Sequence, residues 1–225
     1  MTIEPIAVLR GDFKTKFGVP RQSGLAPALT AKVVFAPEYR DPNALRGLEG
    51  FSHLWLIWGF SENPRPEKWS PTVRPPRLGG NERLGVFATR SPNRPNPIGL
   101  SCVKLLKIEE TATDGTVLVV GGADLVDGTP IYDVKPYVPY ADRVEDATGG
   151  FTDDRAFDRL TVRIPVDLEN RLPAALRNPL CEALALDPRP SYQDDPERVY
   201  GLRFGDYDVK FTVSGNVLTV TDVTK

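Results

Sequence analysis

The chain has 225 residues, of which 40% are hydrophobic and 26% charged, and its formal net charge is −2. This is the composition of an ordinary globular protein, and the near-neutral charge argues against indiscriminate nucleic-acid binding. The longest apolar run, residues 54–58, is far too short to cross a bilayer, and the first residues lack the pattern of a signal peptide. Two cysteines, Cys102 and Cys181, are too few for a disulfide framework. We therefore expect a cytoplasmic protein with buried thiols and no membrane partner.

Histidine and proline usage narrow the class further. A single histidine, His53, and the absence of a Cys or His cluster argue against a zinc site, and no carboxylate spacing indicates another metal. The 22 prolines, about twice the usual share, leave few windows long enough for a helix. The composition therefore predicts mostly β structure, with short helices late in the chain.

The first half of the chain alternates apolar runs with loops rich in glycine and proline. The predicted strands are residues 3–9, 31–35 and 51–60. Residues 17–24 form a loop with Arg21 and Gln22 at its tip. His53 lies on the third predicted strand, and from the residues alone a core histidine bonded to the backbone is the commoner reading.

Two further segments precede the centre of the chain. Asp41 as N-cap, followed by a proline, predicts a short helix over residues 41–50. Residues 62–80 are rich in proline and glycine and are expected to form a long irregular loop, which is usually functional or mobile.

The charges are unevenly spread. Residues 63–107 hold nine Lys/Arg against two Asp/Glu, whereas residues 108–158 hold three against twelve. A basic segment in an acidic chain can contact phosphates locally. Charged loops that simply lie in solvent beside one another explain the pattern equally well.

The central stretch, residues 85–106, has two apolar runs on either side of an eight-residue loop. This loop, residues 90–97, has the sequence RSPNRPNP, with three prolines, two arginines, two asparagines and a serine. Because proline fixes φ and donates no backbone hydrogen bond, the loop is stiff, while its other side chains are hydrogen-bonding or charged. A stiff polar loop between two predicted strands is typical of a binding site, although a rigid surface turn remains the alternative.

An aspartate-rich segment follows a predicted strand at residues 116–120. Asp124, Asp127 and Asp133 are candidates for acid–base chemistry or for contacts to ligand hydroxyls, and turn-capping is an equally good explanation of each. Residues 142–158 are acidic and are expected to be a linker.

The remainder of the chain is expected to form a smaller unit. A strand is predicted over residues 160–164, and Asn178 and Pro179 are expected to begin a helix. Two runs, residues 207–213 and 217–221, predict a hairpin. The chain is thus divided into domains over residues 1–150 and 151–225.

No nucleophile elbow, Walker loop or dinucleotide-binding glycine motif is present. The glycines at residues 79–85 precede a predicted strand, so the helix start that would hold a phosphate is missing. The residues alone therefore predict a mixed barrel or sandwich. Its polar site would be built by three loops, over residues 20–22, 90–100 and 127–130.

Three blocks of this sequence resemble the TrmO (YaeB, TsaA-like) family. They are GLEGFSHLW at residues 47–55, GVFATRSPNRPNPIGLS at 85–101 and DLVDGTP at 124–130. Two later pieces, residues 187–192 and 206–209, resemble the C-terminal domain of the longer bacterial members. The resemblance covers nearly the whole chain. It implies a mainly β fold, with an N-terminal TsaA-like β-barrel and a smaller α+β C-terminal domain that is a possible tRNA-orienting module.

The resemblance also implies an activity. Members of the family are S-adenosylmethionine-dependent tRNA methyltransferases that act as homodimers, with the methyl donor bound close to the subunit interface. They methylate the exocyclic nitrogen of the threonylcarbamoyl-modified adenosine just 3′ of the anticodon in threonine tRNA. The positions that match the family's donor contacts are Pro20, Arg21, Gln22, His53, Leu54, Arg90, Leu100, Asp127, Gly128, Thr129 and Pro130. His53 thus changes from a core residue to an expected neighbour of the donor.

The expected chemistry suggests roles for some of these residues. Arginines suit the carboxylates of donor and substrate, and we expect Arg94, in the middle of the loop, to contact the substrate. The attacking nitrogen must lose a proton, for which Asp127 is the candidate acceptor. Pro92 and Asn93 lie where family members vary, so substrate contacts there can differ. Two alternatives stay open, namely a non-catalytic RNA- or metabolite-binding barrel and the same chemistry on another substrate.

Overall fold

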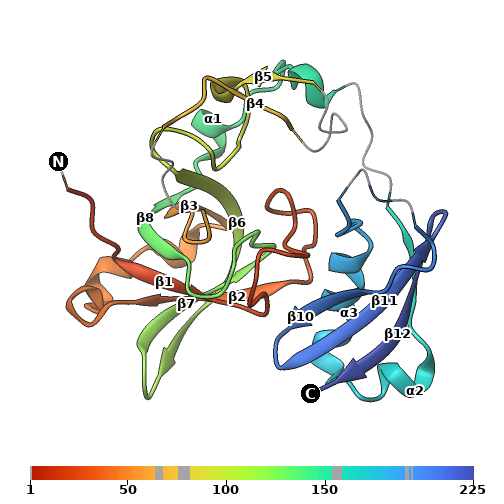
Figure 1. Ribbon diagram of the computed structural model, residues 1–225. Coiled ribbons are helices and arrows are strands. Elements are labelled where there is room, and N and C mark those ends of the chain that lie inside the picture. The colour runs from red at the N-terminus through yellow and green to blue at the C-terminus, as the bar shows by residue number, and fades with distance from the viewer. Residues whose placement is uncertain (1, 64–67, 76–81, 154–158, 191–192, 194) are drawn as a thin grey trace.

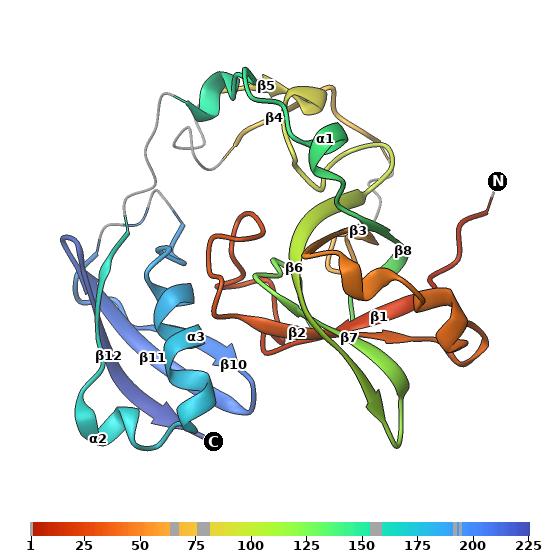
Figure 2. The ribbon, with the colours of Figure 1, turned by 180° about the vertical axis from the view of Figure 1, so that it is seen from behind.

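The computed structural model of the chain describes residues 2–63, 68–75, 82–153, 159–190, 193 and 195–225. It contains two larger sheets that lie side by side, with a smaller two-stranded sheet above the first of them (Figures 1 and 2). Among these described residues, no helix is long and apolar enough to cross a membrane.

Six antiparallel strands form the first sheet. They are β1 (Ala7–Arg10), β2 (Thr30–Phe35), β3 (His53–Gly59), β6 (Ile98–Thr111), β7 (Gly115–Gly121) and β8 (Pro130–Pro136). Their order is β1-β2-β7-β6-β3-β8, and β8 pairs back to β1, so the ring of strands closes into a barrel. Alternate residues of β3 point inward, which buries Leu54, Leu56 and Trp58 in the barrel core.

The C-terminal sheet has four strands in the order β10-β11-β12-β9. They are β9 (Thr161–Arg163), β10 (Tyr200–Phe204), β11 (Tyr207–Ser214) and β12 (Val217–Thr224), and β9 runs parallel to β12. Two helices, α2 (Val166–Glu169) and α3 (Ala174–Leu184), accompany it. Leu180 and Leu184 of α3 share one apolar core with Phe204, Phe211 and Leu218 of the strands.

The C-terminal sheet also holds the loop over residues 11–29 that joins β1 to β2. Phe13 forms an isolated β-bridge with Phe204, and their rings meet edge to face at 5.3 Å. The backbone N–H of Gly205 donates to the carbonyl of Asp12 at 2.7 Å. Phe13, Ala26 and Leu29 are therefore members of the C-terminal core, not of the barrel core.

Short elements connect these sheets. The two-stranded sheet pairs β4 (Thr72–Val73) with β5 (Leu84–Gly85), and helix α1 (Pro139–Asp142) follows β8. The 3₁₀ turns are η1 (Pro37–Tyr39), η2 (Pro42–Leu45), η3 (Leu48–Gly50), η5 (Val86–Ala88) and η6 (Gly150–Thr152).

The predicted class, mainly β with a smaller α+β C-terminal region, is confirmed, and so is the C-terminal hairpin. The division after residue 150 stays a prediction. Strands β8 and β10 were not predicted, and neither was the short strand β4 within the loop expected over residues 62–80. The apolar run after residue 85 was predicted to be a strand, and this is wrong. Val86 N–H donates to the carbonyl of Pro71, and the chain then forms the 3₁₀ turn η5. Parts of the predicted loops over residues 62–80 and 79–85, of the linker over 142–158 and of the block over 187–192 lie outside the described residues.

Two helix predictions are wrong in detail. Residues 41–50 form two 3₁₀ turns, although the Asp41 carboxylate accepts from Asn43 N–H at 2.9 Å as an N-cap would. Helix α3 begins at Ala174, after Pro173, and Pro179 lies inside it. A proline inside a helix removes one backbone hydrogen bond, and here the buried face of α3 against the sheet outweighs that cost.

Candidate functional site

A cavity of about 1420 Å³ lies at the end of the barrel where β3 finishes and β6 begins. Its walls come from residues 16–22, 58–63, 68–75, 87–100 and 124–129 and from Phe151. Small-molecule sites usually occupy roughly 300–1,000 Å³. The cavity therefore has room for a cofactor together with part of a second molecule.

The loop over residues 90–97 forms one wall and is held by its own hydrogen bonds. Arg94 donates from its guanidinium to the carbonyl of Thr89 at 3.2 Å, and from its backbone N–H to the carbonyl of Pro92 at 2.8 Å. The carbonyl of Pro97 accepts from Phe60 N–H at 3.0 Å, which ties the loop to the end of β3. Since prolines already restrict the backbone, these few bonds suffice to preset the loop.

A second part of the wall comes from the β1–β2 loop. Pro20, Arg21 and Gln22 all line the cavity, and the Gln22 side-chain carbonyl accepts a hydrogen bond from the guanidinium of Arg90. Two loops far apart in sequence are thus joined directly at the cavity. A guanidinium presented there can pair with a carboxylate or a phosphate.

The floor of the cavity carries a third polar group, the carboxylate of Asp124. Its Oδ1 accepts from the Ser101 hydroxyl at 2.6 Å, and Ser101 Oγ accepts in turn from Trp58 Nε1 at 2.9 Å. Burial raises the pKa of Asp124, while the Ser101 hydrogen bond and the charge of Arg90 act in the opposite direction. The sequence named Asp124 as one of three candidate aspartates, but nothing in the sequence favoured it over Asp127 or Asp133.

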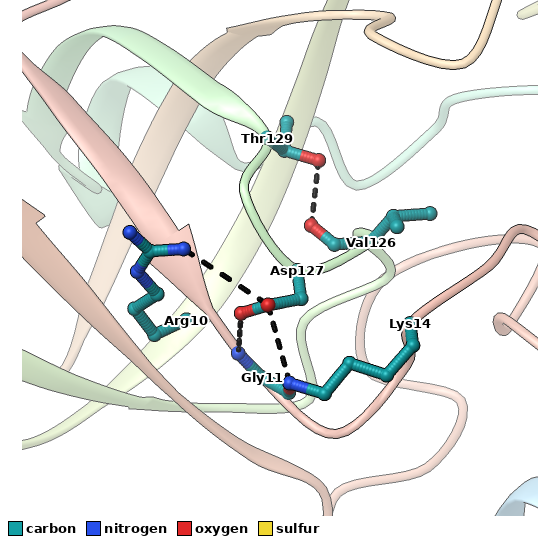
Figure 3. Close-up of polar contacts among 6 residues, drawn as sticks. All are labelled: Arg10, Gly11, Lys14, Val126, Asp127 and Thr129. Atoms are coloured by element: carbon teal, nitrogen blue, oxygen red, sulfur yellow. Dashed lines mark hydrogen bonds and ion pairs between the residues drawn. The ribbon is translucent and has the colours of Figure 1, made fainter. Parts of the chain in front are cut away.

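Asp127 lies three residues further on in a different environment (Figure 3). Its carboxylate accepts from Gly11 N–H at 3.1 Å and from Lys14 Nζ at 3.2 Å, and Arg10 lies 4.0 Å away. Arg10 ends β1, and Gly11 and Lys14 follow it at the start of the β1–β2 loop, so the carboxylate faces the end of that strand. Asp127 does not line the cavity, whereas Thr129 of the same turn does.

Two known domain families match this chain. Residues 8–143 match the tRNA-methyltransferase O N-terminal domain, and residues 159–225 match the TrmO C-terminal domain. The chain belongs to the tRNA-methyltransferase O family.

Individual relatives agree with this assignment. The chain is 41% identical over 219 residues to the tRNA (adenine(37)-N6)-methyltransferase of Escherichia coli, covering 94% of this chain and 92% of the relative. It is 42% identical over 215 residues to a putative S-adenosylmethionine-dependent methyltransferase, RcsF, of Pseudomonas aeruginosa, covering 92% and 90%. The crystal structure of TrmO from Pseudomonas aeruginosa superposes with a TM-score of 0.79 at 35% identity, covering 100% of this chain and 99% of that one.

Within this family fold, the candidate residues divide into two groups. The candidates that line the cavity are Pro20, Arg21, Gln22, Arg90, Arg94, Leu100 and Thr129. The candidates that lie outside its lining are His53, Leu54, Asp127, Gly128 and Pro130. The three loops predicted to meet do meet, but each sends only some of its residues to the cavity.

His53 and Leu54 begin β3, whereas the cavity lies at its other end beside Trp58. Six residues of strand separate His53 from Gly59, which corresponds to about 20 Å. The ring of His53 instead accepts or donates a 2.9 Å hydrogen bond with Ser52 Oγ and contacts Tyr137 edge to face. The side chain of Leu54 is fully buried in the barrel core.

Sequence reasoning missed the aromatic side chains around the cavity. Phe87 lines it with 72% of its surface exposed, and Trp69 lies beside Phe87 with ring centroids 6.1 Å apart. Trp58 packs against Gly99, where a Cβ would collide with the indole ring. The one signal available in the sequence was a tryptophan, Trp69, within the basic segment over residues 63–107, and aromatic side chains among basic ones are typical of single-stranded nucleic-acid binding.

Proposed function

We propose that this protein transfers the methyl group of S-adenosylmethionine to the exocyclic nitrogen of an adenosine in tRNA. We further propose that the base is the threonylcarbamoyl-modified adenosine 3′ of the anticodon in threonine tRNA. The observation that carries the proposal is the cavity itself, where the loops 20–22 and 90–100 meet in a member of a tRNA methyltransferase family. The relative in Escherichia coli, which spans nearly the whole chain, is named tRNA (adenine(37)-N6)-methyltransferase, which supports the first part of the proposal.

The sulfonium of the donor already activates its methyl group, so the protein has mainly to align donor and nucleophile. Orientation of two reactants can lower a barrier by roughly 7–11 kcal/mol. Arg21 and Arg90 are proposed to hold the donor's carboxylate, and the exposed side chain of Leu100 offers an apolar surface to its adenosyl part. Arg94 is proposed to pair with the carboxylate of the threonylcarbamoyl group.

The rim of the cavity suits the loop of an RNA. Trp69 and Phe87 expose aromatic faces on which neighbouring bases can stack, and Lys68 and Arg74 lie in the same wall. A base in an anticodon loop is cheaper to extrude than one in a duplex. The volume of the cavity accommodates both the donor and an extruded nucleoside.

We also propose that the protein is a homodimer. His53, Leu54 and Asp127 match the donor contacts of the family, yet in a single chain they lie outside the cavity lining. A second copy provides a way to bring such residues to a donor bound at a subunit interface. The molar mass in solution, with and without S-adenosylmethionine, tests the dimer. His53→Ala tests the residue, because it should weaken donor binding only if His53 faces a donor.

The decisive experiment is methyl incorporation from labelled S-adenosylmethionine into threonine tRNA, with and without the threonylcarbamoyl group. Incorporation only into modified tRNA supports the full proposal. RNA binding without incorporation at any donor concentration would favour a non-catalytic binding barrel, and incorporation into another RNA would keep the chemistry while changing the substrate.

Two variants test the site assignment. Arg90→Ala and Asp127→Ala should each weaken donor binding or abolish transfer, because the first removes a cation at the cavity and the second disorders the turn that carries Thr129. Tight donor binding together with full activity in both variants would contradict the assignment.

A further inference from the structure

Asp124 ends a chain of hydrogen bonds that leads from the barrel core to the cavity. Trp58 Nε1 can only donate, so the Ser101 oxygen accepts from it and the single hydroxyl proton of Ser101 is left for Asp124. Ser101 is 1% exposed and Trp58 8%, so neither competes with water for these bonds. The chain therefore fixes the orientation of one carboxylate at the cavity floor.

The groups facing Asp124 come from three segments. Ser101 lies on β6, Arg90 belongs to the loop over residues 90–97, and the backbone N–H of Ser23 comes from the β1–β2 loop. Among the described residues, Arg90 is the one charged side chain that acts on Asp124. Arg90 also donates to Gln22, so its guanidinium is shared between two acceptors.

Asp127 offers a direct contrast within the same turn. Its carboxylate is engaged by Lys14 and by Gly11 N–H, with Arg10 nearby, and it lies outside the lining of the cavity. Asp124 is held by a neutral hydroxyl and does line the cavity. Of these two carboxylates, Asp124 is the one that a bound substrate can reach.

We propose that Asp124 is the proton acceptor of the methyl transfer. This inference rests on the proposed function. The lone pair of the adenosine N6 forms a bond to the methyl carbon, and the carbon–sulfur bond breaks with its electrons remaining on sulfur, which leaves a neutral thioether. The N6 proton passes to the Asp124 carboxylate, which becomes neutral and later releases the proton to water.

The surroundings of Asp124 suit this role. Burial raises its pKa and so makes the carboxylate a better base at neutral pH, whereas Ser101 and Arg90 keep it ionised before the reaction. As the sulfonium loses its charge during transfer, the carboxylate loses its own, so the cavity gains no net charge.

The first test replaces the carboxylate with an amide of the same shape. Asp124→Asn in the full chain should bind S-adenosylmethionine within about threefold of wild type, measured by calorimetry, and should lower single-turnover methyl transfer by roughly 10²- to 10⁴-fold. Asp208→Asn is the matched control. Its carboxylate pairs with Arg203 on the C-terminal sheet, and both binding and transfer should be unchanged.

Two results would overturn the inference. Transfer by Asp124→Asn within tenfold of wild type would show that no proton acceptor is lost. A fall in donor affinity that accounts for the whole loss of transfer would assign Asp124 to donor binding instead. If the wild-type protein transfers no methyl group to tRNA, the proposed function itself is wrong. The wild type is assayed first, so this outcome is distinguished from any effect of the variants.

The second test uses pH, which a purely structural role would not change. The hydrogen bond from Ser101 stabilises the ionised carboxylate, so Ser101→Ala should raise the pKa of Asp124 further. The acidic limb of the pH–rate profile should then move upward by about one pH unit, because one hydrogen bond corresponds to about that shift. An unmoved limb in a folded, donor-binding Ser101→Ala would contradict the proposal.

Discussion

One end of the barrel opens into a cavity that is lined by both apolar and charged side chains, whereas the sheet of β9–β12 packs one face against helix α3 in a continuous apolar core. The barrel core consists mostly of aliphatic side chains and Trp58. The C-terminal core adds Phe204, Phe211 and Tyr200 and recruits Phe13 from the other half of the chain. From this difference we expect the barrel to carry the chemistry and the C-terminal sheet to supply rigidity.

The β1–β2 loop connects the C-terminal sheet to the cavity. The same loop presents Pro20 and Gln22 to the cavity and buries Phe13 and Leu29 in the C-terminal core. Phe17 of this loop also stacks on Phe211, with ring centroids 6.5 Å apart. The C-terminal sheet therefore positions one wall of the site without lining much of it.

Removing the contact between Phe204 and Phe13 should cause the largest loss of stability. Phe204→Ala deletes a fully buried ring that meets Phe13 edge to face, and should cost about 3–5 kcal/mol of unfolding free energy. Val199→Ala, at a side chain 56% exposed, should change stability by less than about 0.5 kcal/mol. Urea unfolding measures both. A loss near 1 kcal/mol for Phe204→Ala would show that the two halves of the chain are only loosely joined.

A pair of glycines in the β1–β2 loop sharpens the comparison. Gly18 and Gly24 both have positive φ, at 84° and 79°, but a Cβ on Gly18 would lie 2.5 Å from Leu202 Cδ1, whereas one on Gly24 would meet nothing within 4 Å. Gly24→Ala should cost about 1–2 kcal/mol from backbone strain alone. Gly18→Ala should cost more, because Leu202 is 1% exposed and has little room to move.

Donor binding gives the second readout for this pair. Gly18 lies two residues before Pro20, so its displacement should weaken S-adenosylmethionine binding, while Gly24→Ala should leave binding nearly unchanged. Equal effects of the two variants on stability and on binding would mean that the C-terminal sheet does not position the loop.

The resemblance motifs predicted much of the site but not its details. The stiff loop over residues 90–97, the tip at Arg21 and Gln22, and Thr129 come together as separate stretches of sequence suggested. Which aspartate faces the cavity could not be predicted, because Asp127 is turned aside by Gly11, 116 residues away in the chain. The residues next to Asp127 in the sequence do not indicate that Gly11 is its partner.

The strands, too, could be predicted only where neighbouring residues determine them. Alternating apolar residues predicted β2, β3 and β7, since their pattern reports directly on a buried face. Strand β8 starts at Pro130 and mixes charged with apolar residues, and it is a strand because it closes the barrel between β1 and β3. Phe13 lies between the predicted strand over residues 3–9 and the predicted loop over residues 17–24, and only the C-terminal sheet makes it a core residue.

A tRNA-binding comparison tests which half of the molecule contacts the substrate. Trp69→Ala should raise the KM for tRNA by about 5- to 140-fold, since stacking of one base on an aromatic ring contributes roughly 1–3 kcal/mol. Donor affinity should not change. Arg203→Ala, on an exposed pair of the C-terminal sheet, should leave the KM unchanged. A raised KM in Arg203→Ala together with an unchanged KM in Trp69→Ala would support the prediction that residues 151–225 orient the tRNA.

The smallest expected effect comes from a single hydrogen bond between the halves. Glu182 on α3 accepts from the backbone N–H of Ala28 at 2.8 Å, at the end of the β1–β2 loop. Glu182→Gln keeps the accepting oxygen and removes its charge, so stability should fall by about 1 kcal/mol. Glu197→Gln, at an exposed position, should change it by less than about 0.5 kcal/mol.

Glu182→Gln separates an effect on stability from an effect on the position of the cavity wall. Ala28 lies six residues beyond Gln22, with Ala26 and Leu29 of the same loop still buried in the C-terminal core, so the wall of the cavity should stay in place. Glu182→Gln should therefore bind S-adenosylmethionine within about twofold of wild type despite its lower stability. A clear loss of donor affinity would instead mean that the apolar contacts do not suffice, and that the charge on α3 helps to hold the Pro20–Gln22 wall.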